Sequence, residues 1–129
     1  MILDSTFLID VLRGDADVSD LIEEIDASGT PFVSAVTVME LHEGIHLVDA
    51  TKAERERVRE LLTGINELPF DRACAMRAGE INAGLVSEGD PIDETDVMIA
   101  ATALVNGRPV VTRNTEHFER VEGLDVVTY

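Results

Sequence analysis

Short apolar runs alternate with longer amphipathic stretches along this chain, and the two patterns predict different elements. The apolar runs predict strands at residues 1–3, 32–33, 67–70, 109–111 and 125–128. The strand at 67–70 contains Pro69, which cannot donate a hydrogen bond to a ladder, so we place it at an edge of the sheet.

The amphipathic stretches have the 3.6-residue period of helices. They predict helices at residues 5–13, 18–27, 35–49, 52–64, 72–87, 95–106 and 115–120. Ser34, Thr51 and Asp71 are suited to N-cap three of these helices, and Gly107 is suited to end a fourth. Strands that alternate with helices predict a mostly parallel sheet covered on both faces, which is a three-layer α/β/α sandwich.

Length and composition narrow the class of protein. The chain has 129 residues, of which 45% are hydrophobic, so we expect a single domain over residues 1–129. No apolar run reaches the ~18 residues that cross a bilayer, and no basic segment precedes the apolar start, so we expect a cytoplasmic protein with no membrane partner. Cys74 is the only cysteine, and we expect it in the core with Met76, Ile81 and Leu85.

The charge is strongly negative. Lys and Arg total 10 against 26 Asp and Glu, which gives a formal net charge of -16. Such a surface repels phosphate and disfavours long basic patches for nucleic acid. It fits a halophilic host, because at ~1 M salt the Debye length is only about 3 Å and carboxylate repulsion is screened.

Three carboxylates stand in apolar surroundings. Asp4 follows the first predicted strand, Asp96 opens the most apolar helix, and Glu40 shares a helix face with Met39 and Leu47, which we expect in the core. No lysine or arginine lies three or four residues from Glu40, and an isolated buried carboxylate is costly. Together, three acids at one sheet edge can hold a hard divalent ion such as Mg²⁺, which polarises phosphoryl oxygens.

Two of these acids also have interpretations that need no metal. Asp4 could N-cap the first helix, and Asp96 could complement a helix dipole. Asn114, which follows the strand at 109–111, could N-cap the last helix. Sequence alone leaves these alternatives open for each residue.

Three segments carry a more specific pattern. They are DSTFLIDVLRG at 4–14, VSAVTVMELHEGI at 33–45 and DVMIAATALVNGRPVVTRNTEHFERVEGLDV at 96–126. With them the chain resembles the PIN-domain family of metal-dependent ribonucleases, and most of all the VapC-type toxins of toxin–antitoxin pairs. The resemblance implies an RNA-cleaving active site of Asp4, Glu40 and Asp96 around Mg²⁺ or Mn²⁺.

The chain departs from the family's four-acid pattern at its end. Asn114 stands at the fourth acidic position, and His117 stands where some members keep an aspartate. We therefore expect either a single metal or a second metal site that forms only with the substrate, with Asp93 and Asn114 as candidate outer ligands.

The resemblance also implies substrate contacts and partners. Ser5 and Thr112 would orient metal or substrate, and Asn114 would contact substrate. Arg13 and Arg113 follow segments that form the site and are candidate contacts for RNA phosphates. The family further implies a homodimer and a VapB-type antitoxin whose arm fills the site, with an arginine paired to the carboxylates.

A rival motif lies in the middle segment. His42, Glu43 and His46 form a literal H-E-x-x-H, the pattern of zinc peptidases. Its metzincin extension fails, since Asp49 stands for a glycine and Lys52 for the third histidine. We therefore expect both histidines at the surface or an interface. A free-standing PIN nuclease of RNA processing and a non-catalytic PIN binding module are further alternatives.

Overall fold

A parallel sheet organises the computed structural model, which describes residues 1–15 and 18–129. Within these residues the strands are β1 (Ile2–Leu3), β2 (Phe32–Ser34), β3 (Asn66–Leu68), β4 (Val110–Val111) and β5 (Val126–Val127). They form one sheet in the order β3-β2-β1-β4-β5, and all neighbouring pairs are parallel. β3 is an edge strand and ends before Pro69, as the proline predicts.

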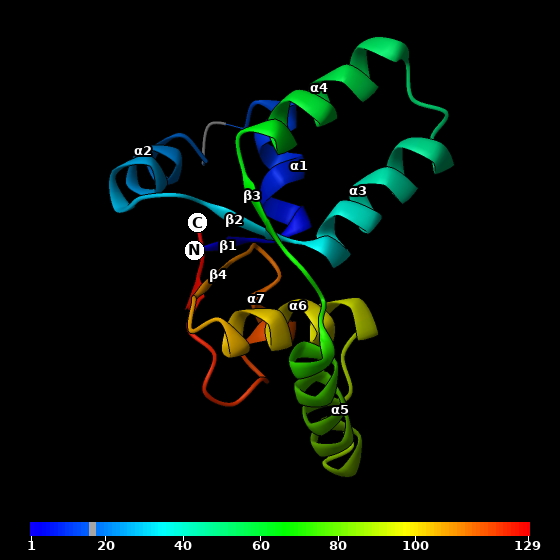
Figure 1. The fold of residues 1–129 in the computed structure, drawn as a ribbon, viewed down its shortest axis with the longest axis vertical. Helices are drawn as coiled ribbons and strands as arrows, with labels where there is room; N and C mark the ends of the chain where they lie inside the picture. The colour runs from blue at the N-terminus through cyan, green and yellow to red at the C-terminus, as the bar shows by residue number, and fades with distance from the viewer. Residues whose placement is uncertain (16–17) are drawn as a thin grey trace.

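Helices connect the strands and cover both faces of the sheet. They are α1 (Ser5–Arg13), α2 (Ser19–Ser28), α3 (Ala35–Leu47), α4 (Lys52–Thr63), α5 (Arg72–Ser87), α6 (Glu94–Val105) and α7 (Thr115–Phe118). Figure 1 shows α1 to α4 on one side of the sheet and α5 to α7 on the other. The predicted three-layer α/β/α sandwich is confirmed.

Successive strand residues belong to two separate cores. Ile2 and Val110 pack with residues of α5, α6 and α7, whereas Leu3 and Val111 pack with residues of α1, α2 and α3. This is the period-two alternation of a strand buried on both faces. Asp4 directly follows β1 and keeps an extended backbone, so the alternation directs its side chain to the face of Ile2, where α6 lies.

Local capping sets the ends of several helices. The predicted N-caps Ser34, Thr51 and Asp71 each accept a hydrogen bond from a backbone N–H two or three residues later, at 3.0 to 3.2 Å. Asp4 and Asn114 occupy the N-cap positions of α1 and α7, but neither side chain makes a capping hydrogen bond. The capping interpretation of these two side chains is therefore wrong.

Three residues predicted in the core lie at the surface instead. Met39 and Leu47 of α3 are 51% and 78% exposed, because α3 runs away from the sheet after its first turns (Figure 1). α3 ends at Leu47, and Asp49 takes a left-handed φ of 49°, so the helix is shorter than predicted. Met76 is 64% exposed, because it lies about 200° around α5 from the buried Cys74.

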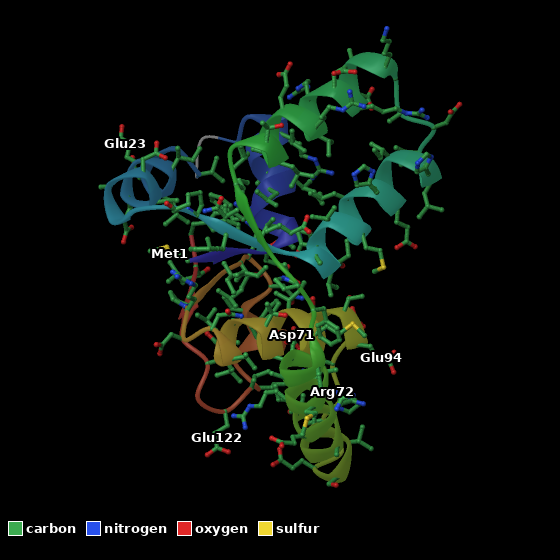
Figure 2. All side chains as sticks on the ribbon, viewed as in Figure 1. Met1, Glu23, Asp71, Arg72, Glu94 and Glu122 are labelled. Atoms are coloured by element: carbon green, nitrogen blue, oxygen red, sulfur yellow. The ribbon has the colours of Figure 1, made fainter. Side chains whose placement is uncertain are left out.

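Acidic side chains project from the outer faces of the helices. Glu23, Glu94 and Glu122 lie at the periphery of the molecule (Figure 2), and all three are exposed. In the described part of the chain, no helix has the length and hydropathy needed to cross a membrane.

Candidate active site

The carboxyl ends of β1 and β4 place two side chains next to each other. Asp4 follows β1 and Thr112 follows β4, and the backbone N–H of Asp4 donates to the carbonyl of Val111 at 3.0 Å. Both side chains are buried, with Asp4 1% and Thr112 0% exposed. Sites in parallel α/β sheets lie beyond this edge, so a charged group here is a candidate functional residue.

Hydroxyl groups hold the carboxylate of Asp4. Thr112 Oγ1 donates to Oδ2 of Asp4 at 2.8 Å, and Thr6 Oγ1 lies 3.0 Å from the same oxygen. Ser5 Oγ lies 3.5 Å from Oδ1. No arginine, lysine or histidine forms an ion pair with Asp4 within residues 1–15 and 18–129, so its negative charge is buried against neutral donors alone.

Glu40 of α3 brings a second carboxyl group to the same place. Burial raises its pKa to about 7, the negative charges of Asp4 and Asp96 add to the rise, and the hydroxyls of Thr95 and Ser5 oppose it. Its Oε1 atom is buried and has no hydrogen-bond partner among the described residues. The electrostatic coupling shows that the fold brings the three predicted acids within range of one another.

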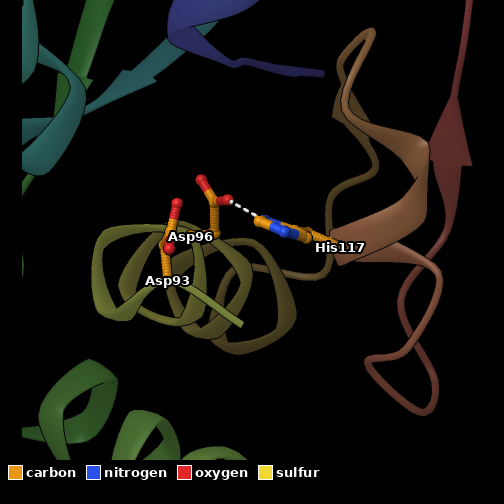
Figure 3. Close-up of side chains that lie close together, drawn as sticks. All are labelled: Asp93, Asp96 and His117. Atoms are coloured by element: carbon orange, nitrogen blue, oxygen red, sulfur yellow. Dashed lines mark hydrogen bonds and ion pairs between the residues drawn. The ribbon is translucent and has the colours of Figure 1, made fainter. Parts of the chain in front are cut away.

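Asp96 in the first turn of α6 is the third acid, and it is 7% exposed. Nδ1 of His117 lies 2.7 Å from its Oδ2 (Figure 3). The amide nitrogen of Asn114 donates to the same oxygen at 3.1 Å. Burial raises the pKa of Asp96, and the charges of Asp4 and Asp93 reinforce this, whereas His117 opposes it. The carboxylate of Asp96 is thus held by two side-chain nitrogens, those of His117 and Asn114.

The site has the chemistry of a divalent-ion site. The three carboxylates offer oxygen ligands, and the partnerless Oε1 of Glu40 is a buried acceptor that a cation would satisfy. Asp93, Asp96 and His117 also offer ligand atoms that all lie within 4.8 Å of one another (Figure 3). The residues present therefore fit a hard divalent metal.

The two arginines predicted to contact phosphate lie beside this site. Arg13 and Arg113 are exposed and line a cavity of about 350 Å³ together with Thr6, Asp10 and Asn114. Nε of Arg113 pairs with Oδ2 of Asp10 at 3.3 Å. Both cations therefore border the same opening as the amide that holds Asp96.

Ser5 and Glu40 open onto a larger apolar groove of about 650 Å³ between α1, α3 and α4. Its lining includes Ile9, Leu41 and Val48. The groove therefore leads from an apolar surface directly to the carboxyl cluster.

Two contacts in the site escaped the sequence analysis. The contact of His117 with Asp96 joins residues 21 positions apart, and the sequence marked position 117 only as one where some family members keep an aspartate. Thr6 bridges Asp4 and the backbone N–H of Arg113, which donates to Thr6 Oγ1 at 3.2 Å. Neither contact follows from spacing, because the first depends on how α7 packs against α6 and the second on the register of β1 against β4.

The H-E-x-x-H motif does not join the site. His42, Glu43 and His46 are exposed on α3, and both histidines line a surface groove with Arg55 and Arg59. Two arginine cations oppose zinc binding there, and no third metal ligand accompanies the histidines in the described residues. The placement agrees with the expected surface position.

Comparisons with known proteins agree with this geometry. Residues 1–124 match the PIN domain family. The tRNA(fMet)-specific endonuclease VapC of Shigella flexneri is 36% identical over 96 residues, which cover 74% of this chain and 73% of the relative.

Solved structures show the same architecture. The DNA-bound VapBC of Salmonella typhimurium matches with a TM-score of 0.89 and 27% identity, covering 98% of this chain and 96% of that chain. VapBC2 of Rickettsia felis, bound to a DNA fragment from the promoter, has a TM-score of 0.91 at 19% identity, covers 99% of this chain and 97% of its own, and attests the fold alone. From its matched residues and its relatives, the chain belongs to the PIN-domain family and stands among the VapC-type ribonucleases.

Proposed function

We propose that this chain is an endoribonuclease in which Asp4, Glu40 and Asp96 hold Mg²⁺ or Mn²⁺, with Asp93 and Asn114 as outer ligands. The observation that carries the proposal is the buried Oε1 of Glu40, which lacks a partner among the described residues beside two further buried acids. A divalent cation would satisfy this oxygen and offset the repulsion among the carboxylates. The relatives named as VapC ribonucleases support RNA as the substrate.

The protein's own groups prepare the site for phosphodiester hydrolysis. A bound divalent ion supplies Lewis-acid polarisation of a phosphoryl oxygen and lowers the pKa of a water. Thr112 and Thr6 fix the orientation of Asp4 through Oδ2, and the hydroxyl of Ser5 lies beside its other oxygen. The carboxylate of Asp4 is therefore already oriented before substrate binds, and little reorganisation remains for the reaction.

Arg13, Arg113 and Asn114 supply the substrate contacts in this proposal. The two guanidinium groups border the cavity beside the carboxyl cluster and can donate charge-assisted hydrogen bonds to RNA phosphates. In a chain of net charge -16, such a local cationic rim gives a polyanion one favourable approach.

The proposal places this nuclease in a toxin–antitoxin pair with a VapB-type antitoxin. Two solved structures that resemble it are VapBC complexes. The apolar groove that carries Ile9 and Leu41 and ends at Glu40 suits an amphipathic arm whose arginine reaches the carboxylates. Co-expression with the small protein encoded beside this gene should give a complex without nuclease activity. Ile9→Glu should abolish that complex and leave metal binding intact.

We also propose a homodimer. Met39 on α3 and Met76 and Val86 on α5 are 51%, 64% and 58% exposed, and contact with a second copy of the chain would remove these apolar side chains from water. Light scattering should give twice the chain mass for the protein and a monomer for Met39→Glu. A monomeric parent protein would contradict this part of the proposal.

The acidic surface supports a cytoplasmic location in a salt-loving host. Glu23 on α2, Glu94 on α6 and Glu122 in the turn after α7 are among the carboxylates spread over the surface (Figure 2). A hydrated acidic surface stays soluble when concentrated salt screens its repulsion.

Two variants that each replace a carboxylate by a neutral amide of the same shape test the catalytic proposal. Asp4→Asn and Asp96→Asn each remove one proposed metal ligand and keep side-chain shape, so each should abolish Mg²⁺-dependent cleavage of RNA. Asp125→Asn removes an exposed acid outside the site and should cleave as the parent does. Cleavage is followed on labelled RNA, with circular dichroism to establish that each variant is folded.

The alternatives give different outcomes in the same assay. Full cleavage by the Asp4→Asn/Asp96→Asn double variant in metal-free buffer would refute the mechanism. A folded protein that binds RNA but never cleaves it with any divalent ion would indicate the non-catalytic binding module.

A further inference from the structure

Within residues 1–15 and 18–129, Asp96 is the one acid of the three with a carboxylate oxygen in contact with two side-chain nitrogens, those of Asn114 and His117. Oδ2 lies 2.7 Å from Nδ1 of His117 and 3.1 Å from Nδ2 of Asn114, and the two nitrogens are 3.1 Å apart. Asn114 lies in the turn between β4 and α7, and His117 lies three residues later in α7. We call these two groups the donor clamp.

Donor and acceptor chemistry fixes the protons in this triangle. A carboxylate oxygen only accepts, and the Asn114 amide must present its nitrogen because its oxygen would repel Oδ2. For the same reason Nδ1 of His117 carries a proton, since a bare nitrogen at 2.7 Å would oppose its lone pair to that of Oδ2. Because both nitrogens are donors, they do not hydrogen-bond to each other. They lie 3.1 Å apart because both donate to Oδ2 of Asp96.

Thr112, at the start of the same segment, also provides a hydrogen-bond donor to a carboxylate of the site. Thr112 donates to Asp4, and its hydroxyl accepts from the backbone N–H of Asn114 at 2.9 Å. Residues 112–117 therefore hold Asp4 through Thr112, and they hold Asp96 through Asn114 and His117. At these three positions the segment presents hydrogen-bond donors to the cluster, not anionic ligands.

We propose that Asn114 and His117 are positioning residues that hold Asp96 through Oδ2, leave Oδ1 for the metal, and so restrict the site to a single divalent ion. The inference rests on the proposed function, since it presumes that Asp96 is a ligand. Hydrogen-bonded partners behind a ligating carboxylate fix its orientation and raise affinity. A second cation beside Oδ2 would meet two N–H donors, which cannot neutralise it.

Binding of Mn²⁺ alone tests the clamp without RNA or activity. Isothermal titration and the paramagnetic resonance signal of free Mn²⁺ should both give one ion per chain. His117→Leu removes a donor and should weaken binding by about 10- to 100-fold. His117→Asn places an amide N–H where Nδ1 was and should restore the affinity. Glu119→Gln, an exposed neighbour, should bind as the parent does.

A double acidic variant tests the stoichiometry. Asn114→Asp with His117→Asp replaces the two donors by carboxylates and should bind two Mn²⁺ per chain. A folded His117→Leu with parental affinity, or a parent protein that binds two ions, would overturn the clamp. If His117→Leu fails to fold, the other two variants still test the clamp. A loss of Mn²⁺ affinity in His117→Asn would overturn it, and so would a single bound Mn²⁺ in the double acidic variant.

Failure of the proposed function looks different. A parent protein that binds no Mn²⁺, with Asp96→Asn unchanged from it, would remove the metal site itself and the clamp with it. A parent that binds one ion through Asp96, whatever stands at position 117, would contradict only the clamp.

Discussion

The phenol of Tyr129 donates a 2.6 Å hydrogen bond to Oδ2 of Asp10. Asp10 is buried in α1, and Nε of Arg113 lies 3.3 Å from the same oxygen while its guanidinium packs 4.9 Å from the Tyr129 ring centre. Phe7 meets that ring edge-on at 5.3 Å. This contact ties the segment after β5 to α1 and holds an arginine at the rim of the site.

Tyr129→Phe should lower the free energy of unfolding by about 1–3 kcal/mol, because Asp10 loses a buried donor. The phenyl ring keeps the contacts with Phe7 and Arg113, so the change isolates the hydroxyl. Urea unfolding of both proteins provides the measurement. Equal stability would mean that Arg113 alone satisfies Asp10.

Alkaline pH should destabilise the protein through the same residue. Burial raises the pKa of Tyr129 well above its usual range, and the hydrogen bond to and charge of Asp10 add to the rise. A raised folded-state pKa gives stability that is complete below the ordinary tyrosine pKa of about 10 and is lost as pH climbs above it.

The measurement is direct because Tyr129 is the only tyrosine and the chain has no tryptophan. Phenolate absorbance should appear only above the ordinary tyrosine pKa, together with unfolding. Asp10→Asn removes the charge and should shift phenolate formation to lower pH. Normal tyrosine titration in the folded parent would contradict this account.

Glu40→Gln should raise the melting temperature of the metal-free protein at neutral pH. The substitution removes a charge that burial and two neighbouring acids disfavour, and Oε1 loses no hydrogen bond. The same variant should lose the increase in melting temperature that Mn²⁺ gives the parent. Scanning calorimetry with and without Mn²⁺ measures both effects. A variant that Mn²⁺ stabilises as strongly as the parent would remove Glu40 from the metal site.

Arg13→Gln should weaken RNA binding in an Asp4→Asn background, where no cleavage interferes. Loss of one phosphate contact should reduce the salt dependence of binding by about one unit in the log–log slope. Arg72→Gln, an exposed arginine at the start of α5 (Figure 2), is the matched control and should leave the slope unchanged. Equal losses in both variants would indicate non-specific attraction alone.

Salt should stabilise the fold. The net charge of -16 repels itself in dilute buffer, and screening removes this repulsion as salt approaches ~1 M. The melting temperature should rise steadily between low salt and that range. Maximal stability in dilute buffer would contradict the inference of a halophilic host.

Much of the site follows from sequence because strand ends are easy to locate. The apolar run before Asp4 and the run before Thr112 mark two carboxyl ends, and parallel pairing brings them together. Asp96 could be placed because one face of its helix is wholly apolar. The proximity of these residues needed only the sheet order.

Other features depend on information that spacing does not carry. Met39 and Leu47 fit a core pattern, yet α3 leaves the sheet, and no local signal shows where a helix loses its neighbours. The contact between Tyr129 and Asp10 joins residues 119 positions apart, and it depends on how β5 lies beside β4. The position of Met76 depends on which face of α5 is buried. Because that face carries Cys74, Met76 two residues later points to solvent.

The hydrogen bond from Thr112 to Asp4 spans 108 positions, and β1 is flanked in the sheet by β2 on one side and β4 on the other. During synthesis the first acid therefore leaves the ribosome long before the segment that orients it. The nascent chain has no assembled centre until residues past 112 have emerged. The proposed metal centre is therefore completed only when the segment after β4 has joined the sheet beside β1.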